Sequence, residues 1–134
     1  MNKKIRHAEP GIKFRSKLEE RIAGELKSQG ISFRYEPEKI SLVEGFHCDV
    51  PFFIDSVLHK EKVRAITYTP DFKATINGYT VYIEAKGYAN DIYPLKRKLF
   101  LRYLKGKERH IFAEVHNVRG LKNTIIKINQ LPNE

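Results

Sequence analysis

The sequence predicts an α/β (α+β) domain with a central mixed β-sheet flanked by helices. Two observations lead to this fold class. Helical and strand-like hydrophobic periods follow one another in the order helix, three strands, helix and strand. The 134 residues, 41% of them hydrophobic, suffice for one buried core, so we expect a single domain over residues 1–134.

An amphipathic helix is expected within residues 16–30, after a flexible basic arm formed by residues 1–13. Its apolar residues recur every four positions and line one face, namely Leu18, Ile22 and Leu26. Ser16 is suited to cap the first turn, with Glu19 as its capping-box partner three residues later. Gly30 is suited to end the helix in a left-handed conformation.

The region after this helix has a weaker pattern. Residues 31–42 indicate a strand with an interruption near Pro37, because proline cannot donate to a strand ladder. Residues 43–62 contain apolar side chains without a steady period, so we expect an irregular loop or a strand extension. We interpret Cys48 as structural or incidental, since a single cysteine cannot form an internal disulfide.

Two alternating segments on either side of an Asn-Gly pair, residues 77–78, predict a β-hairpin. With this pair as the centre of a two-residue turn, the register puts Asp71 directly opposite Glu84. One face of the hairpin is apolar and is the expected core face, with Phe72, Ala74, Ile76, Tyr79, Val81, Ile83 and Ala85. The other face is expected to be largely polar, with Thr69, Asp71, Lys73, Thr75, Thr80, Tyr82, Glu84 and Lys86.

The remaining elements follow the hairpin. A second helix is expected to begin near Tyr93 or Pro94, since proline is tolerated in the first turn of a helix. Residues 109–115 predict a short buried strand. Residues 121–130 fit either a last helix or a last strand, and the pattern does not decide between them.

Two facing carboxylates need an explanation, because opposed residues have Cβ atoms about 4.5–5.5 Å apart and like charges placed so are destabilising. A cation between Asp71 and Glu84 would reconcile them, and oxygen ligands favour a hard ion, Mg²⁺ or Mn²⁺. Lys86, on the same face, could orient an attacking water or neutralise transition-state charge. The alternative is an exposed face of mixed charge, in which Lys73 neutralises Asp71 and Lys86 neutralises Glu84.

The formal net charge of +9 favours a polyanionic partner, most simply a nucleic acid. Candidate phosphate contacts are basic residues of the arm, the first strand and the second helix: Lys3, Lys4, Arg6, Lys13, Arg15, Arg34, Lys96, Arg97, Lys98 and Arg102. The alternative for each cluster is a solvated basic face. No base-reading motif is recognisable, so we expect recognition of DNA shape. The lack of a signal peptide or a long apolar run predicts a cytoplasmic protein without a membrane partner.

A dispersed motif resembles the signature of the PD-(D/E)xK nuclease superfamily: PD at residues 70–71, a gap of twelve residues, then EAK at residues 84–86. The stretches FRSKLEERI, GISFRYE, YTPDF and VYIEAKG also occur in the order seen in Holliday-junction resolvases of the bacteriophage endonuclease I type. RAITYTPDF is similar to a stretch of related small phage endonuclease-like proteins. The resemblance covers residues 14–87 and extends more weakly to residue 115.

The resemblance implies a restriction-endonuclease-like fold and a metal-dependent endodeoxyribonuclease that acts on branched DNA as a homodimer. It implies that Asp71 and Glu84 hold one or two Mg²⁺ or Mn²⁺ ions and that Lys86 is the catalytic lysine. Glu19 would complete the metal site, with Glu20 as the neighbour that could replace it. A phage-encoded protein of this kind would act in the cytoplasm of the host cell.

Two departures from the family pattern leave alternatives open. Arg34 stands where the family has an acid, and Glu36, two residues on, could substitute as a metal ligand. A long insert, residues 37–65, lies in the region where the resolvases join the halves of an intertwined dimer. The alternatives are a restriction- or repair-like nuclease acting on duplex or flap DNA, and a catalytically inert DNA-binding protein on a nuclease scaffold.

Overall fold

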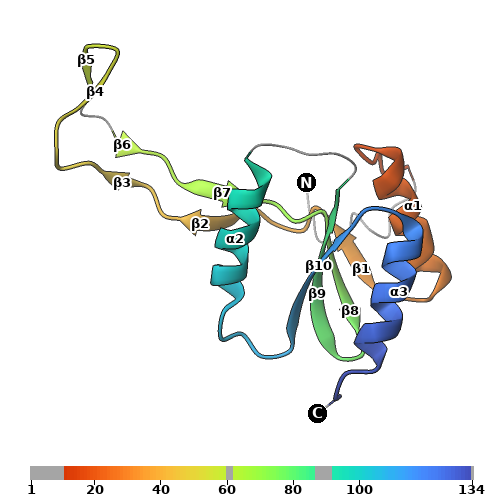
Figure 1. The fold of residues 1–134 in the computed structure, drawn as a ribbon. Coiled ribbons are helices and arrows are strands. Elements are labelled where there is room, and N and C mark those ends of the chain that lie inside the picture. The colour runs from red at the N-terminus through yellow and green to blue at the C-terminus, as the bar shows by residue number, and fades with distance from the viewer. Residues whose placement is uncertain (1–10, 60–61, 87–91, 134) are drawn as a thin grey trace.

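The computed structural model describes residues 11–59, 62–86 and 92–133. As predicted, its architecture is α+β, with three helices, a mixed four-stranded sheet and smaller two-stranded sheets in these residues (Figure 1). The elements in chain order are α1 (Lys17–Ser28), β1 (Phe33–Tyr35), β2 (Ile40–Val43), β3 (Phe46–His47), β4 (Phe52–Ile54), β5 (Val57–His59), β6 (Lys62–Val63), β7 (Ile66–Tyr68), β8 (Phe72–Ile76), β9 (Tyr79–Ala85), α2 (Tyr93–Leu104), β10 (His110–Val115) and α3 (Val118–Asn129). No helix among them has the length and apolar character needed to cross a membrane.

The central sheet has the strand order β1-β8-β9-β10. Strand β8 is antiparallel to both neighbours, and β10 runs parallel to β9. The β8–β9 hairpin has the predicted register, with Phe72 opposite Ile83. Asn77 and Gly78 both adopt the left-handed conformation, with φ of 53° and 78°, as a type I′ turn requires. The hairpin geometry on which the functional prediction depends is therefore confirmed.

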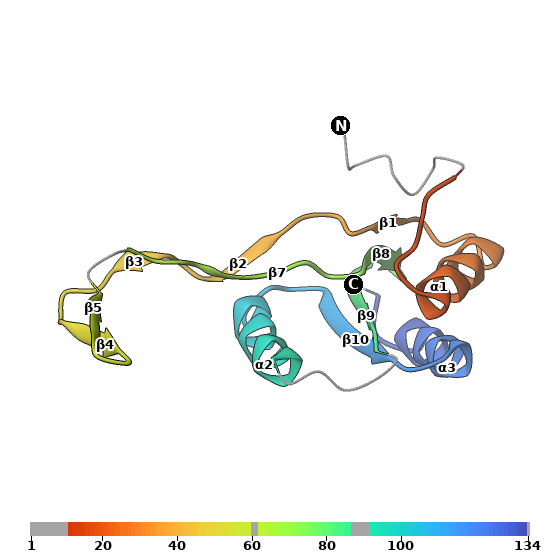
Figure 2. The same cartoon turned by 90° about the horizontal axis from the view of Figure 1, so that it is seen from above.

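Helices α1 and α3 cover one face of the central sheet, and the main core lies between them and the sheet (Figure 2). The buried residues come from both helices and from the expected core face of the hairpin, and include Ile22, Ala23, Leu26, Phe72, Ala74, Ile76, Val81, Ile83, Leu121, Ile125 and Ile128. The C-terminal segment, whose type the sequence leaves open, is thus a helix that supplies part of this core.

Helix α2 covers part of the opposite face, which the sequence predicts to be largely polar. That prediction is wrong at Tyr82, which is only 5% exposed and meets Phe100 of α2 edge to face, with ring centroids 5.2 Å apart. The reason is tertiary, since the position of α2 decides which residues of this face lose contact with water. A second buried cluster forms there from Ile40, Tyr68, Tyr82, Tyr93 and Phe100.

Residues 40–59 and 62–68 form a two-stranded extension, the β-arm, which leaves the body of the domain (Figures 1 and 2). Its antiparallel pairs are β2–β7, β3–β6 and β4–β5, so the segment of unsteady period is a strand extension. The outer strands of this arm expose large apolar side chains, among them Phe46, Phe53, Ile54, Val57 and Leu58. Because these strands have no single buried face, their sequence lacks the alternation that would reveal them.

Candidate active site

The hairpin brings the two acids of the motif to one end of the central sheet. Asp71 directly precedes β8, and Glu84 is the second-last residue of β9. Asp71 Oδ2 accepts a hydrogen bond of 2.8 Å from the backbone N–H of Ala85, so its side chain reaches across to β9. The charge of Glu84 acts on Asp71 at this position, as the predicted register requires.

Helix α1 supplies a third carboxylate, that of Glu19, which is buried at 7% exposure. Ser16 caps the helix as predicted, because its Oγ accepts from the Glu19 N–H at 3.1 Å. The Glu19 carboxylate does not complete a simple capping box with Ser16. Its Oε1 accepts from the Arg15 N–H at 3.0 Å and from the Tyr35 hydroxyl at 2.7 Å. Glu19 is thereby held where it interacts with Asp71, whereas Glu20 is exposed.

Burial and mutual repulsion make this group of acids electrostatically unfavourable. The pKa of Asp71 is raised to about 8, first by burial, next by the charge of Glu84 and then by Glu19. The hydrogen bond from the Ala85 N–H opposes this rise. Burial also raises the pKa of Glu84, although hydrogen bonding from Tyr68 and the charge of Lys86 oppose this rise. The acids are therefore placed where a cation would be stabilised.

A pocket of about 410 Å³ opens beside Glu84. Its lining combines this acid with three cationic side chains and several hydroxyl groups: Arg15, Thr67, Tyr68, Thr69, Glu84, Lys86, Ile92, Tyr93 and Lys96. Lys86 lies over the ring of Tyr93, with Nζ 4.6 Å from the ring centroid. The predicted lysine and two of the predicted phosphate contacts, Arg15 and Lys96, thus line the same pocket as the acid.

Glu36, the possible substitute ligand, forms an ion pair with Arg15, with Oε2 2.7 Å from Nε. Its backbone N–H donates to the carbonyl oxygen of Asp71 at 2.7 Å, which ties the end of β1 to the start of β8. Glu36 has a left-handed φ of 47°, so the strand is not regular at this residue. The structure connects Glu36 to the site through Arg15 and through the backbone.

The other predicted phosphate contacts are spread over the molecule. Lys13 is exposed before α1, and Lys98 and Arg102 are exposed on α2. Arg97 Nη1 donates to Glu114 Oε1 at 2.8 Å, so this arginine also joins α2 to β10. Arg34 faces Lys73 in the neighbouring strand. The remaining three, Lys3, Lys4 and Arg6, lie outside the described residues.

Two tyrosines that support the acids are not singled out by the sequence analysis. Tyr35 donates to Glu19 over a separation of 16 residues, and Tyr68 donates to Glu84 Oε1 at 2.5 Å over the same separation. A weak signal exists for Tyr35, because it alternates with Phe33 on the buried side of β1 and a buried phenol needs a partner. For Tyr68 the sequence offers no such signal before the position of α2 is known.

The carboxylate oxygens of the site suit a divalent cation that takes part of its ligands from water and phosphate. They do not suit one that is bound by protein ligands alone. In residues 11–59, 62–86 and 92–133 there is no group of three or more His, Cys, Asp or Glu side chains placed to hold one ion. A protein cage for Mg²⁺ is therefore not formed by these residues. The pair Asp71 and Glu84 does fit the usual mode of Mg²⁺, which takes one or two carboxylates and obtains its other ligands from water and phosphate.

Comparison with known proteins assigns the chain to a family but does not indicate an activity. A family model described as "Protein of unknown function (DUF1064)" matches residues 2–124. The searches of curated proteins and of solved structures found no match. The function of this chain is therefore inferred from the chemistry of its own residues.

Proposed function

We propose that the chain, which belongs to the DUF1064 family of proteins of unknown function, is a divalent-metal-dependent endodeoxyribonuclease. The observation that carries this proposal is the placement of Asp71 across from Glu84, near Lys86, with the buried Glu19 of α1 acting on Asp71. Buried carboxylates that serve only to stabilise a fold are usually paired with cationic side chains, because burying like charges together is destabilising. Their arrangement supports a site that binds a metal ion and a phosphate group.

Each residue of the site has a defined task in this proposal. Asp71 and Glu84 would hold the metal ion, and Glu19 would add negative charge near Asp71. The Ala85 N–H and the Tyr68 hydroxyl fix the orientation of the two metal-binding carboxylates. One or two Mg²⁺ or Mn²⁺ ions would supply Lewis-acid stabilisation of charge on the scissile phosphate and its leaving oxygen.

The cations of the pocket act on the phosphate. Lys86 orients the attacking water or neutralises the charge that develops in the transition state. Arg15 and Lys96, which line the same pocket, contact the DNA backbone and position the scissile bond. We propose branched DNA, as in a Holliday junction, as the preferred substrate, since the chain has no motif for reading bases.

Cleavage assays with purified protein test this proposal. Four-way junction, flap and linear duplex DNA are incubated with Mg²⁺, Mn²⁺ or EDTA. We expect metal-dependent cleavage that Asp71→Asn and Glu84→Gln abolish while DNA binding survives. Glu19→Gln should also reduce cleavage, whereas its exposed neighbour Glu20→Gln serves as the matched control and should not.

The outcomes separate the alternative functions. Equal rates on all three substrates would remove the preference for branched DNA and favour a duplex or flap nuclease. Tight DNA binding without turnover in either metal would favour an inert DNA-binding protein. Full activity in Asp71→Asn would rule out the proposed mechanism.

We also propose a homodimer whose interface includes the outer β-arm. Isolated two-stranded hairpins are marginal in water, and this one exposes several large apolar side chains. Residues 40–59, which include the apolar tip at β4–β5, contain no lysine or arginine but include three acids, whereas Lys62 and Arg64 lie on the return strand. The apolar tip is therefore the part of the arm least suited to DNA phosphates. A second copy of the chain is the simplest apolar partner, in a two-fold arrangement. Light scattering should show a dimer that Phe53→Ser with Ile54→Ser converts to a monomer, and an unchanged mass would refute this interface.

A further inference from the structure

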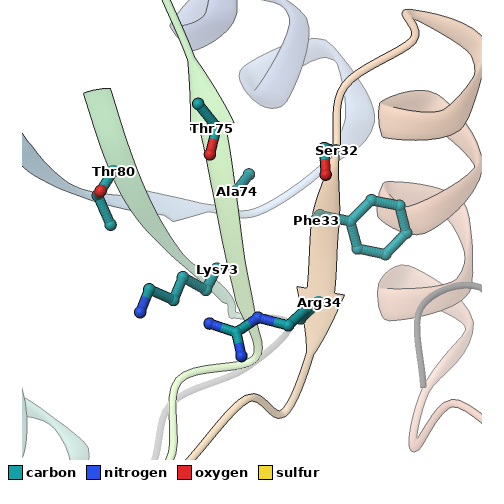
Figure 3. A pocket seen from close by; sticks show the side chains of 7 residues that line it. All are labelled: Ser32, Phe33, Arg34, Lys73, Ala74, Thr75 and Thr80. Atoms are coloured by element: carbon teal, nitrogen blue, oxygen red, sulfur yellow. The ribbon is translucent and has the colours of Figure 1, made fainter. Parts of the chain in front are cut away.

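A second pocket lies on the face of the central sheet opposite α1 and α3, between β1 and β8 (Figure 3). Its volume is about 170 Å³, and its lining residues are Ser32, Phe33, Arg34, Lys73, Ala74, Thr75 and Thr80. Figure 3 shows the Arg34 side chain reaching from β1 toward β8, while the ring of Phe33 is turned toward α1. Lys73 extends onward toward β9, with its Nζ 5.6 Å from the centroid of the Tyr82 ring. The chemically active part of the pocket is therefore cationic, with hydroxyl groups beside it.

Arg34 and Lys73 are direct cross-strand partners in the β1–β8 ladder. Like charges placed opposite one another on neighbouring strands are destabilising unless something neutralises them. Lys73 forms an ion pair with Glu38, whose Oε2 lies 3.8 Å from Nζ, and this contact is long and partly exposed. In the part of the chain that the structure describes, no carboxylate forms an ion pair with Arg34. The pair thus retains net positive charge that an anion could neutralise.

The remaining groups of the pocket suit the oxygens of a phosphate. Thr75 and Thr80 are cross-strand partners in the β8–β9 hairpin, and both line the pocket. Their hydroxyls can donate hydrogen bonds, and arginine can bind two phosphate oxygens at once with its planar fork. A phosphodiester group is small enough for a pocket of this size, and it presents the negative charge that the pair of cations lacks.

The pocket also has a fixed relation to the candidate active site. Lys73 lies two residues along the chain from Asp71, and we expect the two positions to be about 6–7 Å apart at the rise of a β-strand. We propose that Arg34 and Lys73 form a second phosphate-binding subsite, which holds a backbone phosphate next to the scissile one in the same DNA strand. This inference rests on the proposed nuclease function for the identity of the ligand.

Binding measurements test the subsite without depending on cleavage. Affinity for a fluorescent branched DNA and for a single strand is measured by anisotropy in EDTA over a series of salt concentrations. We expect Arg34→Gln with Lys73→Gln to weaken binding at least about tenfold. Loss of two phosphate contacts should also reduce the slope of log affinity against log salt by about 1.5.

Two further variants make the result specific. Lys17→Gln with Arg21→Gln removes the same charge from exposed positions on α1 and should weaken binding much less. Arg34→Lys with Lys73→Arg keeps both charges and should bind nearly as the wild type. A circular dichroism spectrum of the Arg34→Gln, Lys73→Gln variant that matches the wild type excludes a folding defect as the cause. Equal losses in the sheet and α1 variants, or no loss in either, would overturn the subsite.

The same experiment separates this inference from the nuclease proposal. If no variant and no metal gives cleavage but the sheet variant still loses DNA affinity, the subsite stands and the nuclease proposal falls. If cleavage requires Asp71 but the sheet variant binds and cleaves like the wild type, only the subsite falls. A melting temperature that inorganic phosphate raises in the wild type but not in the sheet variant, with DNA affinity unchanged, would reassign the pocket to free phosphate and also overturn it.

Discussion

Raising the pH from 5 to 8 in the presence of EDTA should destabilise the folded protein, and Asp71→Asn should remove much of this loss. Burial, followed by the charge of Glu84, raises the pKa of Asp71 from 3.8 to about 8. The unfolded chain loses this proton near pH 4, whereas the folded protein keeps it until about pH 8. Because the folded state binds the extra proton, its free energy of unfolding falls as the pH rises through this window.

The magnitude follows from the width of the window. Each pH unit over which only the folded state keeps the proton contributes about 1.4 kcal/mol. For Asp71 the interval from pH 5 to pH 8 corresponds to at most about 4 kcal/mol, and we expect about 2–4 kcal/mol. Such a loss is a large part of the total stability of a domain of ordinary size, about 5–15 kcal/mol.

Urea denaturation followed by circular dichroism at pH 5, 6, 7 and 8 measures this effect. The difference between wild type and Asp71→Asn isolates the contribution of the acid group from other titrations. Asp49→Asn, at an exposed position of the β-arm, is the matched control and should keep the slope of the wild type. Millimolar Mg²⁺ or Mn²⁺ at pH 8 should raise the free energy of unfolding of the wild type, and should raise that of Asp71→Asn less. An Asp71→Asn variant with the full pH-dependent loss would refute the electrostatic reasoning.

Three further predictions concern single side chains. Lys86→Met should lower DNA cleavage by about 10²–10⁴-fold with little change in DNA affinity, as steady-state kinetics and anisotropy would show; unchanged turnover would contradict the catalytic role. Tyr35→Phe removes a hydroxyl that donates to the buried Glu19 and should reduce the free energy of unfolding by about 1–3 kcal/mol in urea, with no effect expected if that bond is unimportant. Gly78→Ala should cost about 1–2 kcal/mol in thermal unfolding, because a Cβ at a φ of 78° would lie 2.8 Å from Nη2 of Arg109; an unchanged melting temperature would show that the turn relaxes.

The parts of the structure that sequence alone predicts are those set by local chemistry. The Asn-Gly turn at residues 77–78 fixes the hairpin register, and this register brings Asp71 beside β9. The cap formed by Ser16 and the start of α1 depend on a few neighbouring residues in the same way. Such features need no knowledge of the rest of the fold.

The parts that sequence does not predict depend on contacts between distant segments. Burial of Tyr82 requires α2 to cross that face of the sheet, and the bond from Tyr35 to Glu19 requires β1 to lie beside α1. The strands of the β-arm are not predicted from the sequence, because strands without one buried face lack alternating apolar and polar residues. The cationic pocket depends on the pairing of β1 with β8, which brings Arg34 next to Lys73.

Residues at the root of the β-arm, Thr67 and Tyr68, also line the pocket beside Glu84. Strand β7 ends at Tyr68, whose hydroxyl holds Glu84, and the chain reaches Asp71 only three residues later. Between them Pro70 is fully buried and has a fixed φ, so this short connection has little slack. A partner bound to the arm would therefore act close to both carboxylates, because only residues 69 and 70 separate β7 from Asp71.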